Sequence, residues 1–392
     1  MERFDVVILG AGAAGMFCAI EAGRRGRRVL VIDHAAAAGE KIRISGGGRC
    51  NFTNLGTTAE RFWSQNPRFA LSALKRYSPW DFIARLDAAR IAWHEKTLGQ
   101  LFCDGPATQI VALLLADMRR AGVTLWLNTA PGEVQHTAAG FTVETARGPV
   151  AAGSVVVATG GKSIPKMGAT GYGLRLAESF GLRVVETRPG LVALTLTPPD
   201  LAALRPLAGV AVAGRATVRG VGFDEAVLFT HRGLSGPAIL QISSCWREGD
   251  RIHLDLARGH DAGAILRDAR GKAGRMALRT TLAQILPEKL ARHIEALAGV
   301  NGRLADQSNA VIERVAALVH DWQLRPAGSE GYRTAEVMLG GVDTDDLQAR
   351  TLEARSVPGL YFIGEVVDVS GWLGGYNFQW AWSSGWAAGQ VA

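Results

Sequence analysis

The order of hydrophobic and polar positions along the first 190 residues predicts alternating strands and helices. Short, nearly uninterrupted apolar runs, typical of strands covered on both faces, occur at residues 4–9, 29–32 and 155–158. Segments that we expect to be helical lie at residues 13–24, 66–90 and 107–121. A hairpin is expected at residues 91–102, and further strands at residues 123–127 and 141–145. The predicted fold class is therefore α/β, with a Rossmann-like nucleotide-binding domain.

The pattern changes at Pro189 and Gly190, after which short β-rich runs are separated by proline and glycine. From residue 261 to 323 the apolar spacing becomes helical. Leu282, Ile285, Leu286, Leu290 and Ile294 are expected on one helical face, as are Val311, Val315, Leu318 and Val319. We predict that residues 1–190 and 340–392 form the nucleotide-binding domain. Residues 191–260 and 324–339 are predicted to form an inserted β-domain, and residues 261–323 a helical insertion.

A glycine-rich turn follows the first predicted strand and has the spacing of a phosphate cradle. Gly10 permits the tight turn, Gly12 lets the backbone approach a pyrophosphate, and Gly15 lets the next helix pack closely on the sheet. The turn also contains Ala13 and Ala14, at the positive end of that helix. Asp33 follows the second strand, 18 positions after Gly15 (33 − 15), and is expected to hold a ribose hydroxyl.

Two further glycine-rich segments lie far along the chain, and we assign both to the same cofactor site. The first is Thr159, Gly160 and Gly161, directly after a predicted strand. The second contains Gly364, Glu365, Gly374, Gly375, Tyr376 and Asn377. A helix is expected to begin near Gly375, where its dipole would stabilise negative charge on a reduced ring system. Three such segments in this order indicate a sheet whose last strand comes from the C-terminus.

The segment from Gly39 to Asn54 is expected to be a loop that is rich in glycine and basic residues. Consecutive glycines are costly to order, which suggests a close approach of the backbone to a ligand. We include Lys41, Gly47, Gly48, Arg49, Cys50 and Asn51 in the predicted cofactor site. Cys50 has two interpretations: a catalytic proton donor or thiol, or a small side chain that fills a tight gap.

A second group of candidate catalytic residues lies at His231 and Arg232, between a predicted strand and a helix. These side chains could bind an anionic or carbonyl group of a substrate, although a lone histidine is more often structural. Ser235 or Gly236 is expected to cap the following helix, with Pro237 at its first position. The sequence contains no spacing that predicts a metal site.

The composition of the chain indicates the cellular setting in which we expect the protein. Of the 392 residues, 48% are hydrophobic and 20% charged, which suits a folded protein with a sizeable core. No apolar run reaches 18 residues, and the four cysteines are scattered, so we expect a reducing, cytoplasmic setting without a membrane span. The net charge of +7 would favour RNA, although a basic proteome would give the same value.

Taken together, these motifs resemble a bacterial flavoprotein family. It includes aminoacetone oxidase-like proteins, a bile-acid ene reductase and a 23S ribosomal RNA dihydrouridine synthase. The resemblance rests on GAGAAG at 10–15, SGGGRCNFTN at 45–54, ATGG at 158–161, FTHRGLSGPAIL at 229–240 and the block at 358–385. It implies FAD, and a flavin domain with an inserted β-barrel-like domain that carries a helical insertion. Asp33, Tyr172, the segment Leu101–Asp104 and Trp372 depart from the usual pattern of the family.

The function expected from this resemblance is an FAD-dependent reductase that acts on an activated C=C bond, with a uridine of 23S rRNA as the best guess. NADPH or NADH is expected as a transient reductant, although the chain contains no second nucleotide fingerprint. One alternative is a small-molecule flavin reductase or amine oxidase with a soluble substrate. Another is a flavin-binding redox sensor without turnover.

Overall fold

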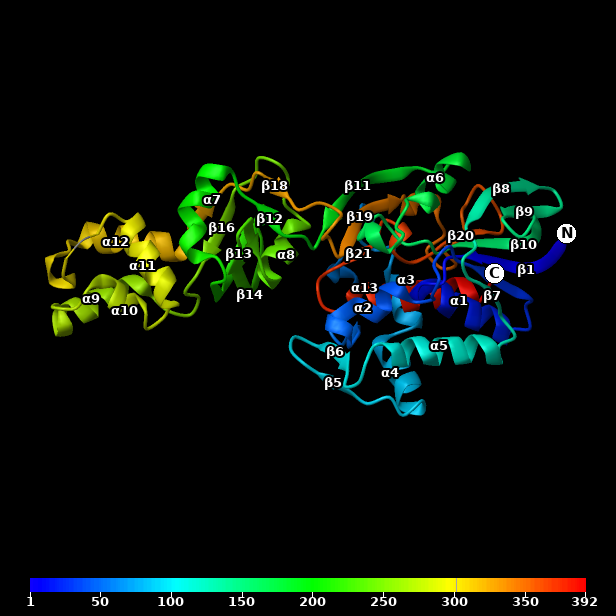
Figure 1. The fold of residues 1–392 in the computed structure, drawn as a ribbon, viewed down its shortest axis with the longest axis horizontal. Helices are drawn as coiled ribbons and strands as arrows, with labels where there is room; N and C mark the ends of the chain where they lie inside the picture. Colours follow the sequence, from blue (N-terminus) through cyan, green and yellow to red (C-terminus); the bar gives the residue numbers. More distant parts are fainter. Residues whose placement is uncertain (301) are drawn as a thin grey trace. The chain divides into compact units, whose positions relative to one another are not determined.

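The computed structural model describes residues 1–300 and 302–392 and divides into two units. Unit 1 contains residues 1–188 and 337–392, and unit 2 contains residues 189–336. Figure 1 shows the elements of both units, with the N-terminal and C-terminal segments together in unit 1. No helix among the described residues is long and apolar enough to cross a membrane.

Unit 1 is built on a seven-stranded sheet in which the order is β7-β2-β1-β10-β9-β8 and β20 also pairs with β10. The parallel strands are β1 (Glu2–Leu9), β2 (Val29–Ile32), β7 (Thr124–Trp126), β10 (Val150–Val157) and β20 (Leu360–Phe362). Strands β8 (Pro131–Thr137) and β9 (Gly140–Thr145) are antiparallel. In the register, Leu9 lies beside both Ile32 and Val157, so three strands end at the same edge. The predicted α/β fold with a Rossmann-like domain is confirmed, and the C-terminal segment supplies β20.

Helices α1 (Ala13–Arg24), α5 (Thr108–Arg120) and α13 (Tyr376–Gly389) form the core of unit 1 beside this sheet. Helix α1 packs on α13 so closely that a Cβ added at Gly385 would lie 2.6 Å from the Ala14 carbonyl oxygen. Trp380 and Trp382 on α13 are fully buried, and Trp382 stacks on Phe82 with 4.3 Å between ring centroids. A helix that is apolar on nearly all sides is expected to be buried in this way.

Several elements of unit 1 differ from the sequence-based expectation. The predicted loop at 39–54 contains helix α2 (Glu40–Gly48) and strand β3 (Asn51–Asn54). The predicted helical stretch at 66–90 is two helices, α3 (Leu71–Arg76) and α4 (Pro79–Ala88). Pro79 cannot continue the hydrogen bonding of α3, and the Ser78 backbone N–H and hydroxyl both donate to Asp81 (2.7 and 2.6 Å), which starts the second helix.

The predicted hairpin is present as β5 (Trp93–Glu95) and β6 (Gln100–Cys103), and β6 also pairs with β3. The smaller elements of unit 1 are β4 (Phe62–Trp63), α6 (Tyr172–Ser179), β19 (Val337–Val342) and β21 (Ser370–Gly371). Strand β11 (Val184–Gly190), which pairs with β19, runs to the boundary of the unit.

Unit 2 contains a second seven-stranded sheet with the order β17-β16-β13-β14-β15-β12-β18. Its strands are β12 (Leu194–Thr195), β13 (Ala211–Val218), β14 (Val221–Phe229), β15 (Gly233–Ser235), β16 (Ile252–Asp255), β17 (Trp322–Leu324) and β18 (Gly328–Ser329). All its pairs are antiparallel. Helices α7 (Pro198–Leu204) and α8 (Pro237–Ser243) accompany it.

Four helices lie between β16 and β17 in sequence: α9 (Ala262–Ala273), α10 (Leu278–Leu282), α11 (Glu288–Leu297) and α12 (Asn309–His320). The apolar face expected from Leu282 to Ile294 is divided between α10 and α11, because Pro287 caps the start of the second helix. Leu282, Leu290 and Ile294 are nevertheless all buried. Asn301, inside the predicted helical range, lies outside the described residues.

Candidate functional site

The turn between β1 and α1 has the geometry of a phosphate cradle. Gly10 adopts φ +113°, and a Cβ there would lie 2.4 Å from the Ala158 carbonyl oxygen. A Cβ at Gly15 would lie 2.0 Å from the Gly10 carbonyl oxygen, so neither position accepts a side chain. Gly12 is different, since no atom lies within 4 Å of the corresponding position. The backbone is therefore open at Gly12, in front of the positive end of α1.

Asp33 follows β2 and braces this turn. Its carboxylate accepts hydrogen bonds from the backbone N–H groups of Ala11 (2.6 Å) and Ala35 (2.8 Å), one on each oxygen. Each carboxylate oxygen has a further lone pair. The role predicted for Asp33, a hydrogen bond to a ribose hydroxyl, is compatible with these two contacts.

The glycine segment is a kinked helix end rather than an irregular loop. Helix α2 breaks at Ser45, where ψ is 149°, and Gly46, Gly47 and Gly48 all adopt left-handed φ values of 56–85°. No atom lies within 4 Å of the position of a Cβ on Gly47, so the backbone is open here as well. Arg49 is exposed at the end of this segment.

Cys50 is fully buried directly after this kink, in the left-handed conformation at φ +50°. Burial raises the pKa of its thiol to about 12, against the effect of a hydrogen bond with Ser45. The side chain is thus a neutral thiol at physiological pH. This environment suits the interpretation in which Cys50 fills a tight gap, and a thiolate role is disfavoured.

Strand β3 and the start of α13 are joined side by side although more than 300 residues separate them. The Asn51 amide, oriented as its neighbours require, donates to the Leu101 carbonyl (3.1 Å) and accepts from Gly375 N–H (3.2 Å). Asn54 donates to the Gly374 carbonyl at 2.8 Å. Gly375 has φ +96°, and a Cβ there would lie 2.3 Å from the Thr53 carbonyl oxygen. We call this contact between residues 51–54 and 374–375 the clasp.

Helix α13 begins at Tyr376, as the sequence analysis expected. The Asn377 side chain closes the preceding turn, since it accepts from Gly371 N–H (2.8 Å) and donates to the Gly371 carbonyl (3.0 Å). Gly364 lies beside the first turn: a Cβ there would be 3.0 Å from the Ala14 Cβ. The C-terminal glycine segment is therefore joined to the first glycine turn and, through the clasp, to residues 51–54.

A half-buried charged cluster connects α2 with the segment after β20. Lys41 Nζ donates to Glu365 Oε2 and to Ser163 Oγ, both at 2.7 Å. Ser163 Oγ and Met338 N–H donate to Glu365 Oε1 at 2.8 and 2.9 Å. Burial alone would raise the pKa of Glu365, but the Lys41 ammonium and these hydrogen bonds hold it below its usual value. Both cluster residues predicted from the sequence, Lys41 and Glu365, are thus in direct contact.

The sequence analysis missed Ser163, which is completely buried and lies two positions after Gly161. A hydroxyl residue that follows a strand-ending glycine pair was the available signal. It also missed Gln379, whose side chain accepts from Thr53 Oγ1 (2.5 Å) and donates to the Tyr77 carbonyl (2.9 Å). Gln379 lies one turn into a predicted helix of packing residues, where nothing in the local pattern marks it.

The residues present fit FAD by three observations. The backbone is open at Gly12, where a pyrophosphate is expected, and at Gly47. The Thr159 hydroxyl is buried and has no hydrogen-bond partner within the described part of the chain, as expected for a group that a ligand satisfies. The positive end of α13 follows the turn that contains Gly374 and Gly375.

The other candidate catalytic residues lie in unit 2. His231 and Arg232 are exposed in the short connection between β14 and β15, where Thr230 Oγ1 accepts from Arg232 N–H (3.2 Å). Arg232 lies 3.7 Å from a carboxylate oxygen of Glu330. Gly236 caps α8, and Pro237 is its first residue. The structure describes Cys50 and this pair in different units, so a joint catalytic role stays a prediction.

No group of three or more His, Cys, Asp or Glu side chains in residues 1–300 and 302–392 is arranged to hold a metal ion. The cofactor residues predicted from the sequence all lie in unit 1, around the edge at which the parallel strands end. This is the edge at which open α/β sheets bind ligands.

The chain belongs to the HI0933-like family: the model of the HI0933-like protein Rossmann domain matches residues 4–391. The chain is 51% identical over 392 residues to the "Ribosomal RNA dihydrouridine synthase" of Escherichia coli (strain K12), covering 100% of this chain and 98% of that protein. It is 28% identical over 402 residues to the "3-dehydro-bile acid delta(4,6)-reductase" of Clostridium scindens (strain ATCC 35704 / DSM 5676 / VPI 13733 / 19), covering 98% of each.

Among solved structures, the fold is similar to that of 3-ketosteroid-delta4-(5alpha)-dehydrogenase from Rhodococcus jostii RHA1. The TM-score is 0.51 at 15% identity, with 99% of this chain and 97% of that chain covered. The family expected from the sequence is confirmed, and with it the class of enzyme, an FAD-dependent oxidoreductase.

Proposed function

We propose that this flavoprotein of the HI0933-like family reduces a uridine of 23S rRNA to dihydrouridine, with NADPH or NADH as electron donor. The observation that carries the proposal is similarity at 51% identity, over the whole length of both chains, to a protein named ribosomal RNA dihydrouridine synthase. Because ribosomal RNA is the proposed substrate, we place the reaction in the cytoplasm.

The residues that would hold FAD follow from the geometry of unit 1. The open backbone at Gly12 and the start of α1 would bind the pyrophosphate, and Asp33 would bind a ribose hydroxyl. The segment 47–51, the turn 159–161 and the start of α13 would contact the remaining parts of the cofactor. Bound there, FAD would supply the hydride that adds to C6 of the uracil.

The chain itself must then deliver one proton to C5 of the base and exclude water from the site. The Cys50 thiol keeps its proton at physiological pH, since burial raises its pKa to about 12. Its complete burial means that the base cannot reach it without movement of the kinked segment. His231 is exposed. Cys50 and His231 both stay candidate proton donors, and Arg232 stays a candidate group for binding the base.

The clasp supports this proposal because it holds two parts of the predicted cofactor site in fixed positions. Residues 51–54 and 374–375 are fixed to one another by hydrogen bonds from both backbone and side chains. Both segments belong to the predicted cofactor site, and a site is accurate when such contacts hold its parts. A target base must leave its stack to reach a flavin held in this way.

The proposal is tested by mass-spectrometric mapping of dihydrouridine in 23S rRNA from the native host, with and without the gene. Loss of one dihydrouridine, restored by the wild-type gene, is the expected result, and the variants His231→Asn and Cys50→Ser that retain FAD then show which side chain the reaction needs. A map that is unchanged by deletion refutes the RNA substrate. NADPH or NADH must also bleach the purified flavoprotein anaerobically, and failure of both refutes the proposed reductant.

A second candidate is a small-molecule C=C reductase, which the similarity to a bile-acid delta(4,6)-reductase favours. Its substrate would be a soluble enone, and its turnover would depend little on salt because few phosphate contacts are made. Steady-state reduction of a steroid enone, with an unchanged rRNA map in the deletion strain, would support this candidate instead.

A further inference from the structure

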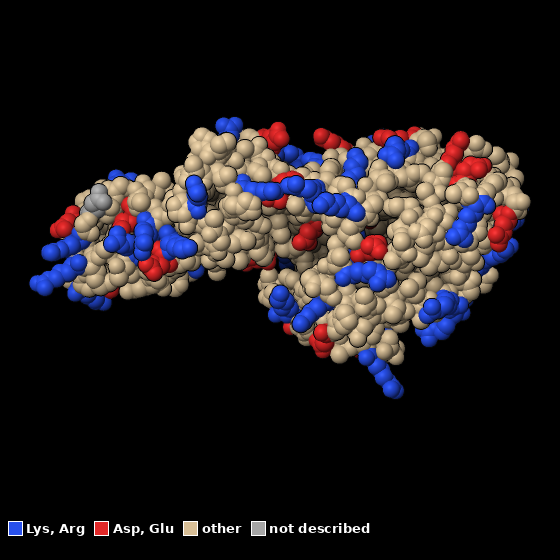
Figure 2. Space-filling view, viewed as in Figure 1, with Lys and Arg blue, Asp and Glu red and all other residues tan. Residues whose placement is uncertain are grey.

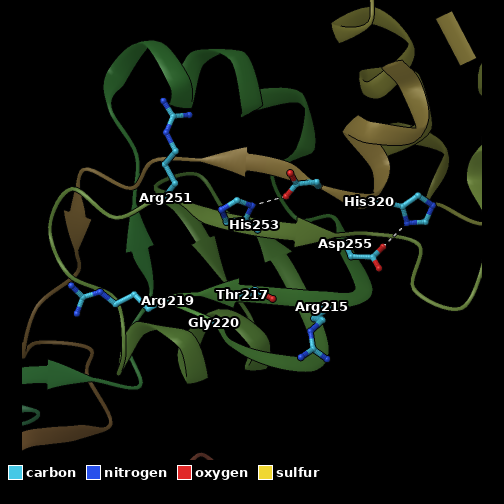
Figure 3. Close-up of a pocket in the computed structure, with 9 residues that line it drawn as sticks. Arg215, Thr217, Arg219, Gly220, Arg251, His253, Asp255 and His320 are labelled. Carbon is cyan, nitrogen blue, oxygen red and sulfur yellow. Dashed lines mark hydrogen bonds and ion pairs between the residues drawn. The ribbon is translucent and has the colours of Figure 1, made fainter. Parts of the chain in front are cut away.

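The outer face of the unit 2 sheet carries a polar pattern that its fold does not require. Along β13, Arg215 and Thr217 alternate with the buried Ala216 and Val218, and Arg219 follows in the hairpin turn. Along β16, His253 and Asp255 alternate with the buried Ile252 and Leu254, and Arg251 directly precedes the strand. These polar residues line one open hollow of about 610 Å³, together with His320 and Asp321 (Figure 3). One side of the sheet is thus core and the other is a charged surface.

The charges on this face are separated along the strands. At one end, Arg215 and Arg258 both bind the Asp224 carboxylate, Arg215 at 2.9 Å. In the middle, His253 contacts Asp321 (2.6 Å) and His320 contacts Asp255 (2.9 Å), and Figure 3 shows both pairs. Acidic residues therefore largely offset the positive charge over most of the face.

The other end is positive. The register pairs Thr217 with His253, so the hairpin turn that contains Arg219 lies at the same end of the sheet as Arg251, which directly precedes β16. Leu324 pairs with Ile252, so Arg325, directly after β17, lies at this end as well. We call Arg219, Arg251 and Arg325 the arginine face. Arg219 binds Asp250 at 3.0 Å, whereas the described residues offer no ion pair to Arg251 or Arg325.

Folding does not explain this arrangement. Like charges gathered at one end of a sheet repel one another, so this placement does not stabilise the fold. An Arg325 nitrogen lies 3.7 Å from the position of a Cβ on Gly249, so its guanidinium extends over the turn before Arg251. Three exposed arginines thus flank the ends of β13, β16 and β17, and one acid partly balances them. Such a group suits a ligand with several negative charges.

We propose that the arginine face binds the phosphate backbone of the substrate RNA, an inference that rests on the proposed RNA substrate. Each strand of a nucleic-acid duplex carries one phosphate for about every 3.4 Å of helix axis, so arginines spread along one end of the sheet can contact two or three phosphates. The face presents no large aromatic ring for stacking on bases, so its contribution is independent of base sequence. On the view of Figure 2, basic and acidic side chains are interspersed, so net charge alone does not locate such a face.

The test uses the full chain loaded with FAD and an unmodified 23S rRNA transcript, with the dissociation constant measured from 50 to 300 mM KCl. The variant is Arg219→Gln, Arg251→Gln and Arg325→Gln combined. We expect its affinity to fall about tenfold at 50 mM salt, and the slope of log affinity against log salt to decrease by about 2, for three lost phosphate contacts. The triple lysine variant keeps the charge and should retain most of the slope.

The matched control removes three exposed arginines elsewhere, by Arg3→Gln, Arg27→Gln and Arg119→Gln. It has the same change in net charge, and no described ion pair is lost. Circular dichroism and flavin absorbance check that each variant is folded and loaded.

The inference is overturned if the two glutamine variants have equal slopes. It is also overturned if the arginine-face variant raises only the KM for NADPH, which would indicate a small phosphate ligand. The same holds if that variant binds the transcript normally but loses dihydrouridine in cells, which would indicate a protein partner. A wild-type protein that does not bind the transcript at all refutes the RNA substrate itself, a result distinct from these.

Discussion

Removal of the Lys41 ammonium tests how much the cluster of Lys41, Ser163 and Glu365 stabilises the folded protein. In the variant Lys41→Met the aliphatic part of the side chain is kept, while Glu365 loses both the hydrogen bond at 2.7 Å and the charge that lowers its pKa. A hydrogen bond to a charged group contributes about 1.5–3 kcal/mol. The side chain of Lys41 is 36% exposed, so solvent screens it and we expect the lower part of this range, about 1.5–2 kcal/mol at pH 7.

The pKa of Glu365 determines how the stability difference between wild type and Lys41→Met changes with pH. In the wild type the pKa of Glu365 is lowered in the folded state, so its contribution to stability is present above the unfolded pKa of about 4.3 and is lost as pH falls. Without Lys41, burial dominates and the folded pKa rises. Folding then favours the protonated acid, and the variant loses stability as pH rises above about 4.3. The difference between the two proteins should therefore widen from pH 4 to pH 7.

Urea unfolding followed by tryptophan fluorescence measures this difference. Of the ten tryptophans, Trp246 and Trp322 lie in unit 2, so the other eight report on unit 1. The double variant Lys41→Met with Glu365→Gln removes the buried charge, and it should recover much of the loss at pH 7. A difference that stays constant between pH 4 and 7, or a double variant no more stable than Lys41→Met, would refute the reasoning.

Three further predictions follow from the same geometry. Gly375→Ala places a Cβ 2.3 Å from the Thr53 carbonyl oxygen, so we expect loss of most bound flavin absorbance and a stability loss of about 2–4 kcal/mol. Gly148→Ala has a similar φ of +97° but open space, and should cost only about 1 kcal/mol and retain flavin. Gly12→Glu also meets open space, so the free energy of unfolding of the apoprotein should change by less than about 0.5 kcal/mol. The carboxylate would occupy the position of the phosphate, so calorimetry should show an FAD affinity at least about 100-fold weaker. Because the pKa of Cys50 is about 12, Cys50→Ser should leave the pH profile of kcat unchanged between pH 6 and 9, and an ionisation that disappears in this variant would show that the thiol titrates during turnover.

The short-range elements of unit 1 could be read from the sequence because their causes are local. The turn from β1 to α1 needs glycines where the backbone is crowded, and helix α13 begins directly after a glycine pair in left-handed conformation. Where local signals competed, the prediction was wrong. Residues 40–48 were assigned to a loop because of three glycines, yet the helix-compatible residues 40–44 before them form the first turn of α2. Pro79 and Pro287 each divide a segment that apolar periodicity had treated as continuous.

The sequence by itself determined the α/β fold class, the glycine turn after β1 and the family, because each depends on residue types at fixed short spacings. Only the tertiary structure decided that Lys41 lies against Glu365, and that Asn51 lies against Gly375. These contacts join residues more than 300 positions apart, and the packing of α13 against β3 and α1 sets them rather than any local propensity. Likewise, Arg219, Arg251 and Arg325 are scattered in sequence, and the pairing of β13, β16 and β17 brings them to one end of the sheet. Spacing along the chain determines local motifs, whereas the pairing of strands and the packing of helices determine contacts between distant residues.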